Sequence, residues 1–253
     1  MPQQYDLHVV SNRSLTPHMR RIVLAGDALS EFPRDQESGY VKVGFSLEDG
    51  NHVMRSYTVR AFDAAANQIT LDFVDHGDTG PASKWARNAE VGSAVSIFGP
   101  GEKKLADPSA SWLFLGGDLS ALPALSVNME QLPDTAKGYA VIEVPHAEDI
   151  QDLAHPEDLQ VHWVVSADGA PPNTALTQKI RSLPWLDGTA YPWFAGEFSG
   201  MRDMRSYFRD ERGVDRRAMY LSCYWKVGDS DEGMKKAKRQ DAEEDARLAA
   251  EPV

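Results

Sequence analysis

Apolar and polar residues alternate in short runs along the first part of the chain, and turn-forming Gly, Asn and Asp residues separate the runs. A period of two is typical of a strand with one face toward a core. We expect strands at residues 5–15, 19–26, 40–47, 55–63, 68–76 and 93–100, with one helix over 81–88. Strands at this spacing predict an antiparallel β-barrel or sandwich. The GPGEKK stretch at 99–104 closes the unit, so the first domain is predicted over residues 1–104.

Beyond residue 104 the pattern changes to strands that alternate with helices. Strands are expected at 111–118, 137–145, 161–167, 190–197 and 217–225, helices at 120–133, 173–183 and 199–213, and a helical turn at 147–154. This alternation predicts a parallel sheet with helices on its faces, a Rossmann-like α/β domain over residues 105–228. The fold class is therefore α+β with two domains, a β-barrel followed by an α/β unit.

Residues 229–253 form a polar tail that mixes acidic and basic residues at helical spacing and contains few apolar ones. We expect a solvated helix that packs weakly or frays. Lys235, Lys236 and Lys238 could form an anion-binding patch on it, but a solvated face is the favoured interpretation.

Composition and charge exclude several classes of function. The chain of 253 residues is 42% hydrophobic and 25% charged, with a formal net charge of -12. Such an acidic chain is not expected to bind nucleic acid non-specifically, because that requires a basic face. The start, MPQQYDLHVV, lacks the features of a signal peptide, and no apolar run is long enough for a membrane span. We therefore expect a cytoplasmic protein without stable membrane insertion.

The sequence contains no recognisable metal-binding motif. The single cysteine, Cys223, cannot form an internal disulfide, and the histidines are scattered without ligand spacing. No nucleophile motif or pair of carboxylates points to hydrolysis. An organic cofactor would have to carry any redox chemistry.

One predicted strand contains the sequence RSYTVR at residues 55–60, and neither of its faces is cleanly apolar. Arg55, Tyr57 and Val59 share one face, while Ser56, Thr58 and Arg60 share the other. A flat polar ligand against the strand would explain this mixture. Taken alone, an edge strand protected by its charges is the favoured interpretation.

Two further stretches have the composition of ligand-binding turns. In HGDTGPAS a strand ends near His76, a turn spans residues 77–81 and a helix begins around Ala82, which is an arrangement that can hold a phosphate or simply cap a helix. Gly116 and Gly117 follow a buried strand, and the stretch WFAGEFSGMR repeats the order of strand, glycine, acid and helix. Two such turns on one rim of a parallel sheet predict a crevice, although the G-x-G-x-x-G fingerprint is missing.

Together these motifs resemble the siderophore-interacting proteins, the ferric-siderophore reductases within the ferredoxin-reductase-like flavoproteins. The stretches that carry the resemblance are RSYTVR, LDFVDHGDTGPASKWA, GDLSALPA, PWFAGEFSGMRDMRSYFRDERG and YWKVG. The resemblance implies FAD between the two domains, NADH or NADPH as electron donor, and reduction of Fe(III) in a siderophore to Fe(II). A general NAD(P)H-flavin reductase, a ferredoxin-type reductase and a non-catalytic siderophore carrier are the alternatives. A ferredoxin is an alternative electron donor and protein partner, and a monomeric state is expected.

The resemblance also assigns roles to individual residues. Arg55 would neutralise the diphosphate of FAD, Tyr57 would pack against the isoalloxazine, and Thr58 would hydrogen-bond near N5. The remaining cofactor contacts that it implies are Ser56, Val74, His76, Gly80, Pro81, Ala82, Ser83 and Trp225 for the flavin site, with Asp118, Leu119, Ser120, Ala121, Gly196 and Glu197 beside the nicotinamide nucleotide.

For the siderophore, the resemblance points to Lys42 and Lys226 as a local basic rim. The family often carries arginines after the ALPA helix start, where this chain has Ser126, Asn128 and Glu130. This departure makes a hydroxamate an alternative to a highly anionic catecholate. A basic pocket for a 2'-phosphate could come from Lys179, Arg181 or Arg202.

Overall fold

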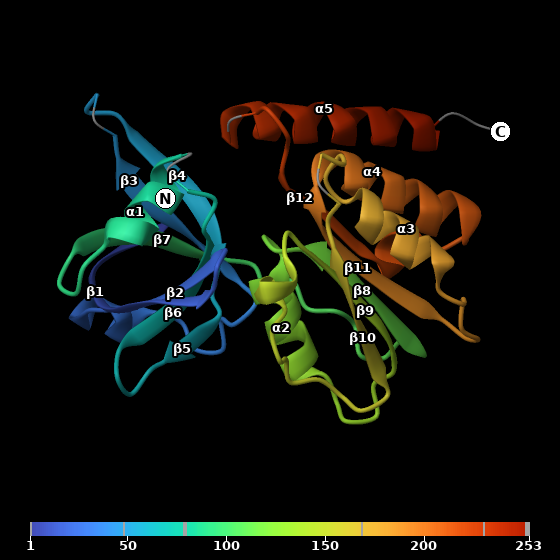
Figure 1. Ribbon diagram of the computed structural model, residues 1–253, viewed down its shortest axis with the longest axis horizontal. Helices are drawn as coiled ribbons and strands as arrows, with labels where there is room; N and C mark the ends of the chain where they lie inside the picture. Colours follow the sequence, from blue (N-terminus) through green and yellow to red (C-terminus); the bar gives the residue numbers. More distant parts are fainter. Residues whose placement is uncertain (1, 48, 78–79, 168, 230, 251–253) are drawn as a thin grey trace.

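The computed structural model describes residues 2–47, 49–77, 80–167, 169–229 and 231–250. It has two lobes, one from each half of the chain, with the C-terminal helix lying across the top in the view of Figure 1. The first lobe holds a seven-stranded sheet with the order β4-β3-β7-β1-β2-β6-β5, and every pairing in it is antiparallel. Its strands are β1 (Gln3–Thr16), β2 (Met19–Ala25), β3 (Tyr40–Ser46), β4 (His52–Thr58), β5 (Ala61–Asp63), β6 (Gln68–Val74) and β7 (Ala94–Gly101).

The sheet curls because its two edge strands are consecutive in the chain. The predicted strand over 55–63 is divided: β4 ends at Thr58 and β5 begins at Ala61. Between them Val59 donates its backbone N–H to Gly39, next to β3, whereas Arg60 donates to Thr70 on β6. The chain therefore passes from one edge of the sheet to the other within two residues. The expected barrel is confirmed as this curled antiparallel sheet.

An apolar core fills the curl. It consists of Tyr5, Leu7, Val9, Ile22, Leu24, Leu29, Phe32, Val41, Val43, Phe45, Val59, Ile69, Leu71, Phe73, Ala86, Ala89, Val95 and Ile97. One 3-10 turn (Asp27–Glu31) and α1 (Pro81–Asn88) close its ends. The alternating apolar positions of the strands supply this core, as the period of two predicts.

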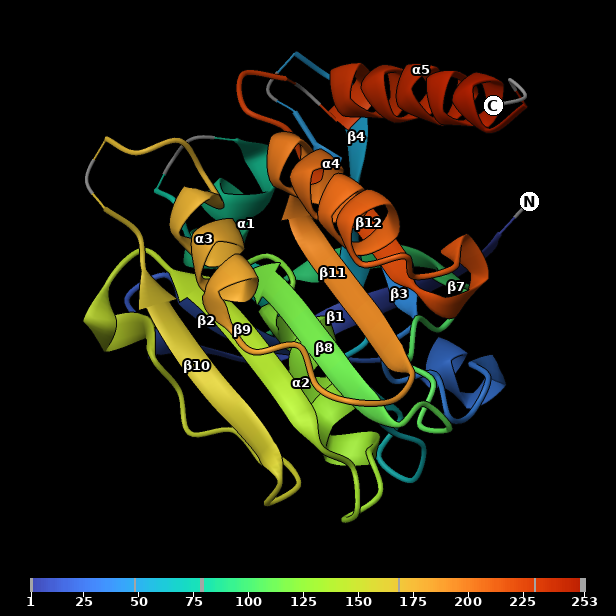
Figure 2. The ribbon, with the colours of Figure 1, turned by 90° about the vertical axis from the view of Figure 1, so that its right-hand side faces the viewer.

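The second lobe is a five-stranded parallel sheet of order β10-β9-β8-β11-β12. Its strands are β8 (Trp112–Asp118), β9 (Gly138–Val144), β10 (Leu159–Val165), β11 (Ala190–Glu197) and β12 (Tyr220–Trp225). Figure 2 shows α3 (Thr174–Ser182) and α4 (Phe198–Ser206) on one face and α2 (Leu122–Gln131) on the other. A π-helical segment (Tyr207–Glu211) continues α4, and 3-10 turns span Ala147–Asp149 and Arg216–Ala218. The expected α/β fold is confirmed, although the turn predicted at 147–154 is shorter.

The two lobes share an apolar and polar interface. Met19 of β2 is buried within the core that α2 forms with β8 and β9. His18 donates its backbone N–H to Asp149 at 2.9 Å, and its Nδ1 lies 2.7 Å from the same carboxylate. Arg60 forms an ion pair with Glu130 of α2, so it is not the solvent-side charge of an edge strand. These contacts hold the lobes in one arrangement.

The C-terminal helix α5 (Asp231–Ala250) confirms the predicted tail helix but corrects its packing. Asp241 and Asp245 are buried, where the sequence predicted a solvated face. Asp241 accepts hydrogen bonds from Arg205 of α4 at 3.1 and 2.6 Å. Asp245 forms ion pairs with Arg205, Arg209 and Arg216. Ion pairs to two buried aspartates thus attach this helix, which lacks a broad apolar face, to the rest of the protein. None of the helices in the described ranges has both the length and the apolar character that a bilayer crossing requires.

Candidate functional site

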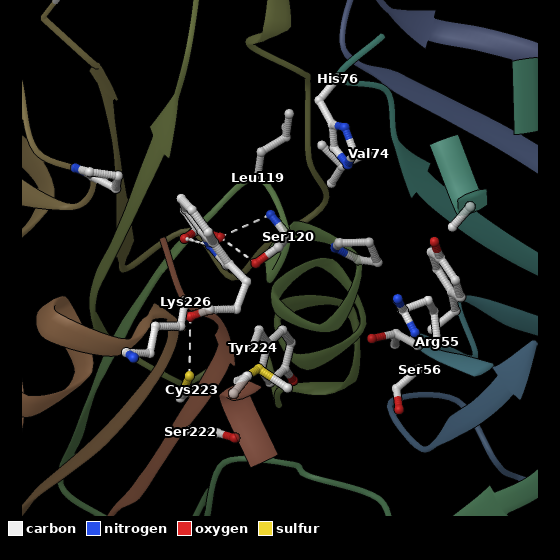
Figure 3. A pocket seen from close by; sticks show the side chains of 18 of the residues that line it. Arg55, Ser56, Val74, His76, Leu119, Ser120, Ser222, Cys223, Tyr224 and Lys226 are labelled. Atoms are coloured by element: carbon white, nitrogen blue, oxygen red, sulfur yellow. Dashed lines mark hydrogen bonds between the residues drawn. The ribbon is translucent and has the colours of Figure 1, made fainter. Parts of the chain in front are cut away.

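A cavity of about 1470 Å³ lies between the two lobes and is lined by residues of both. In Figure 3, Arg55, Ser56, Val74 and His76 approach it from one lobe, and Leu119, Ser120 and Tyr224 from the other. Most of the residues expected from the sequence line it, namely Lys42, Arg55, Ser56, Tyr57, Thr58, Val74, His76, Gly80, Pro81, Ala82, Ser83, Asp118, Leu119, Ser120, Trp225 and Lys226. Ala121, Gly196 and Glu197 are not among its lining residues.

The wall on the side of the first lobe is built from β3 and β4. These strands pair so that Lys42 lies opposite Ser56 and Tyr40 opposite Thr58. Arg55 donates from Nη1 to the carbonyl of Met54 at 2.9 Å, and no ion pair with a carboxylate is found for it in the part of the chain that the structure describes. Its charge is therefore available to an anionic ligand.

Tyr57 of β4 has one face of its ring covered by the protein. Its ring centroid lies 4.0 Å from that of Phe73, and it packs against the core of the first lobe. Burial raises the pKa of the Tyr57 phenol, against a smaller opposite effect of Arg55. The phenol is neutral at physiological pH, and the residue offers the cavity an aromatic surface backed by a second ring.

The turn before α1 is held by Ser83. Its hydroxyl donates to the Gly77 carbonyl at 2.7 Å and accepts the backbone N–H of His76 at 3.2 Å. Because Ser83 is buried and engaged in this way, it positions the turn rather than offering a free hydroxyl. Gly80 precedes the helix with a φ of 102°, which only glycine adopts without strain, and Pro81 begins α1. Asp78 and Thr79 of the same motif lie outside the described residues.

On the opposite side, Asp118 at the end of β8 has its bonding capacity filled. Oδ1 accepts the backbone N–H of Ser120 at 2.9 Å and the hydroxyl of the same residue. Oδ2 accepts the side-chain amide of Asn173 at 3.1 Å and the indole N–H of Trp225 at 2.8 Å. A carboxylate offers about four acceptor positions, so Asp118 is saturated by the protein.

Glu143, at the end of β9, is held in the same manner. It accepts the Ser166 hydroxyl at 2.7 Å, and the backbone N–H groups of Asn173 and Leu176 at 3.3 and 2.9 Å. The two amides belong to the start of α3. Glu143 therefore occupies donors that a helix N-terminus would otherwise present to an anion.

Asn173 joins three strand ends and was missed by the sequence analysis. Besides its bonds to Asp118 and Glu143, its Oδ1 accepts the backbone N–H of Glu197 at 2.8 Å. It is buried and has a φ of 62°, a left-handed conformation that asparagine tolerates. The turn sequence PPN before a helical pattern was the available signal, but it does not reveal the partners.

Gly196 and Glu197 support Asn173 rather than line the cavity. A Cβ atom on Gly196 would lie 2.6 Å from Asn173 Oδ1, which explains the glycine. Glu197 caps α4 by accepting the N–H of Ser199 and also accepts the N–H of Val227 at 3.2 Å. Ala121 is fully buried at the start of α2. These three residues therefore act through the scaffold of the site.

The strand β12 contributes a polar and aromatic stretch that lines the third side of the cavity. Burial raises the pKa of the Cys223 thiol to about 11, and this thiol donates to the Trp225 carbonyl at 3.1 Å, a bond drawn in Figure 3. Burial and the neighbouring Tyr220 raise the pKa of Tyr224 well above its usual value. The thiol and phenol are protonated at neutral pH, so Cys223 is not a reactive thiolate.

The basic residues of the cavity differ in how far they are neutralised. Lys226 is paired with Asp229. Lys42 has no ion pair with any residue in the described ranges. Arg181 is paired with Asp203 and Glu211, and Arg202 with Asp241; neither arginine lines the cavity. Lys179, the third candidate for a 2'-phosphate pocket, does not line it either.

Ser126, Asn128 and Glu130, which follow the ALPA start, make contacts within the protein. The Ser126 hydroxyl donates to the Leu122 carbonyl at 2.8 Å, and the Asn128 side chain bonds to Lys104 and Ala106 in the connection between the lobes. Glu130 is the partner of Arg60. Asn128 and Glu130 therefore help to join the lobes, whereas Ser126 bonds within α2.

Comparisons with known proteins agree with this arrangement. The model of the siderophore-interacting FAD-binding domain matches residues 8–53 and 46–104, and that of the siderophore-interacting protein matches residues 110–228. The ferric vibriobactin reductase ViuB of Vibrio cholerae is 33% identical, over 89% of this chain and 90% of that protein. The chain belongs to the siderophore-interacting protein family.

Solved structures of this family share the whole architecture. The siderophore-interacting protein SipS from Aeromonas hydrophila superimposes with a TM-score of 0.85 at 32% identity, covering 96% of this chain and 99% of that one. A ferredoxin NADP+ reductase from Neisseria gonorrhoeae has a TM-score of 0.64 at 12% identity, covering 89% and 100%. The second likeness shows that the family has the two-domain fold of the ferredoxin reductases.

The cavity wall of the first lobe fits FAD. Its features are Arg55, which has no carboxylate partner among the described residues, the glycine that precedes α1, and the Tyr57 ring, which is backed by Phe73. A diphosphate requires positive charge and backbone N–H groups, and a flat ring system requires an aromatic or apolar surface. No group of metal-ligating side chains is found among the described residues.

Proposed function

We propose that this chain is a flavin-dependent ferric-siderophore reductase that takes electrons from NADH or NADPH and releases Fe(II) in the cytoplasm. The main support for this proposal is the cavity between the lobes. On one side it is lined by residues of β3, β4 and α1 that suit FAD, and on the other by residues at the strand ends of the α/β lobe. ViuB, a relative with this activity in its name, covers most of the chain and supports the proposal.

Within this proposal the residues of the first lobe hold FAD. Arg55 and the backbone at residues 80–82 bind the diphosphate, Tyr57 offers its ring to the isoalloxazine, and Thr58 donates or accepts near the reactive edge. When bound, FAD supplies the conversion of a two-electron hydride donor into single-electron transfers. Ser56, Val74, His76 and Trp225 border the same space. The division into residues 1–104, 105–228 and 229–253 belongs to the proposal, as does a monomeric state.

The residues of the chelate site are Lys42 and Lys226. Lys42 keeps its charge without an ion-pair partner in the described residues, whereas that of Lys226 is shared with Asp229. With Ser126, Asn128 and Glu130 used internally, the cavity has few uncompensated cations for a highly anionic catecholate. We therefore place ferric hydroxamates ahead of ferric catecholates as substrates.

The reaction has a fixed stoichiometry. One hydride carries two electrons, so one NAD(P)H reduces two Fe(III) chelates and yields NAD(P)+, one proton and two Fe(II). The test is an anaerobic titration of the purified, FAD-loaded protein with NADH or NADPH, in which a visible spectrum follows the flavin. A ferric siderophore is then added, and the Fe(II) that forms is trapped and measured. Two Fe(II) per nucleotide oxidised would support the reductase. A spectrum that no nucleotide bleaches, with a chelate still bound, would instead support a carrier.

If a reduced ferredoxin alone bleaches the flavin, the donor assignment is wrong while the reductase assignment stands. If free flavin is a far better acceptor than any ferric chelate, the protein is a general flavin reductase. A protein that binds no FAD would overturn the proposal as a whole.

A further inference from the structure

The strand ends of the α/β lobe are closed to phosphate. Asp118 and Glu143 lie side by side on β8 and β9, and both line the cavity. No ion pair to either carboxylate is found among the described residues, yet seven donor groups of the chain are directed at the two of them. Glu143 engages the amides of Asn173 and Leu176 at the start of α3, and Asp118 engages the amide of Ser120, two residues before α2. A pyrophosphate here would lose these backbone donors and meet negative charge.

Positive charge is found on another side of the same cavity, on α5. Lys238 lines the cavity, and its Nζ donates to the backbone carbonyl of Cys223 at 2.9 Å. This acceptor is neutral, and Lys238 forms no ion pair with the residues that the structure describes. Lys235 and Lys226 line the cavity nearby, the latter paired with Asp229. Lys238 is therefore a partly buried cation without an ion-pair partner among the described residues.

We propose that the pyrophosphate of the nicotinamide nucleotide binds against Lys238 on α5, and that the strand ends, which hold this group in other nucleotide-binding sheets, do not contact it. This inference rests on the proposed function, because it concerns the binding of the electron donor to that same cavity. It assigns a ligand contact to the C-terminal helix, whose lysines were expected on a solvated face.

The test compares Lys238→Gln with Lys236→Gln in the FAD-loaded protein. Lys236 is exposed on the same helix and does not line the cavity, so it matches the charge change without the contact. Two binding probes are titrated by calorimetry: NAD+, which carries a pyrophosphate, and nicotinamide riboside, which carries no phosphate. A charged hydrogen bond lost at this site is expected to weaken NAD+ about tenfold. Nicotinamide riboside should bind equally to all three proteins, and Lys238→Arg should restore NAD+ binding.

Kinetics provide the second arm. Lys238→Gln should raise the KM for NADH and NADPH about tenfold. It should leave flavin reduction by 1-benzyl-1,4-dihydronicotinamide, a hydride donor without phosphates, unchanged. An equal effect of Lys236→Gln, no effect of Lys238→Gln on NAD+, or an effect limited to an anionic ferric chelate would each overturn the inference.

Failure of the inference and failure of the proposed function are separable. If wild-type protein binds no NAD+, the inference is wrong, while Fe(II) release from a ferric chelate by dithionite-reduced protein still tests the reductase. If dithionite-reduced protein releases no Fe(II) but NAD+ binding depends on Lys238, the contact between Lys238 and the pyrophosphate is supported and the reductase function is rejected.

Discussion

The two walls of the cavity are both polar, but their charged groups are in opposite states. On β3 and β4, Lys42 and Arg55 have no carboxylate partner in the described chain. At the ends of β8 and β9, Asp118 and Glu143 have N–H and O–H donors on both oxygens. A polar side chain at a cavity is available to a ligand only while its bonding capacity is unfilled. The comparison therefore separates ligand contacts from scaffold residues that look alike in the sequence.

The largest effect is expected at the centre of the saturated wall. Asn173→Ala removes one donor from Asp118 and the acceptor of the Glu197 N–H, all within a buried network. We expect the free energy of unfolding to fall by about 2–4 kcal/mol, because buried groups are left without partners. Urea denaturation measures this, and Asn51→Ala in an exposed turn is the control.

FAD affinity provides the contrast for that variant. FAD titration of the folded fraction of Asn173→Ala should give a wild-type affinity, since Asn173 lies in the wall that does not hold the flavin. A near-neutral effect on stability would show that the network is not tightly coupled.

The next effect concerns the open wall. Arg55→Ala should weaken FAD by about 10- to 100-fold, the loss of a charge-assisted contact of about 1.5–3 kcal/mol, and leave the stability of the apoprotein nearly unchanged. Fluorescence titration of apoprotein with FAD measures the affinity. Arg13→Ala, an exposed arginine on β1, controls for net charge. If Arg55→Ala instead destabilises the apoprotein, Arg55 belongs with the scaffold residues and the comparison between the walls fails.

A smaller effect is expected from Cys223 at high pH. Burial raises its pKa to about 11 from an ordinary value of 9.0. Because the folded-state pKa is higher than the unfolded one, the thiol stabilises the protein fully below pH 9, and this contribution is lost as the pH rises toward 11. Unfolding free energies between these pH values should fall more steeply in the wild type than in Cys223→Ala.

Tyr57 and Tyr224 also have raised pKa values, so they too lower the unfolding free energy as the pH rises. Because both tyrosines are present in the wild type and in Cys223→Ala, the difference between the two proteins reports on the thiol alone. Iodoacetamide should modify native protein very slowly at pH 8 and urea-unfolded protein rapidly. Fast alkylation of the native state would show that the thiol is exposed or ionised.

The smallest effect is expected at the pair that holds the walls facing each other. A double-mutant cycle with Arg60→Ala and Glu130→Ala should give a coupling of about 0.5–1 kcal/mol, because the pair is partly exposed, and 1 M salt should reduce it. Arg60 also approaches Asp72 at 4.0 Å, so the single Arg60 variant should cost more than the single Glu130 variant. Equal costs would show that the Arg60–Asp72 contact contributes nothing.

Much of the fold follows from local pattern. The alternation with a period of two along residues 5–100 and the strand–helix order beyond 104 predict both sheets, because side chains on a strand or helix face reveal which side is buried. Arg55 and Tyr57 were singled out because a strand with a cation and a ring on one face is unusual. Each of these features is contained within a few consecutive residues.

Pairing between distant segments was decided by the tertiary structure. Asp118 and Gly196 belong to similar turns in the sequence, but one lines the cavity and the other makes room for Asn173. Arg60 pairs with a residue 70 positions away, and arginines of α4 and the segment after it pair with two buried aspartates of the tail helix. Whether all acceptor positions of a polar side chain are filled depends on hydrogen-bond donors that the fold brings together. The local sequence pattern does not show these donors, because they lie far away in the chain. For that reason Lys238 looked like a solvated lysine until the packing of α5 put it in the wall of the cavity.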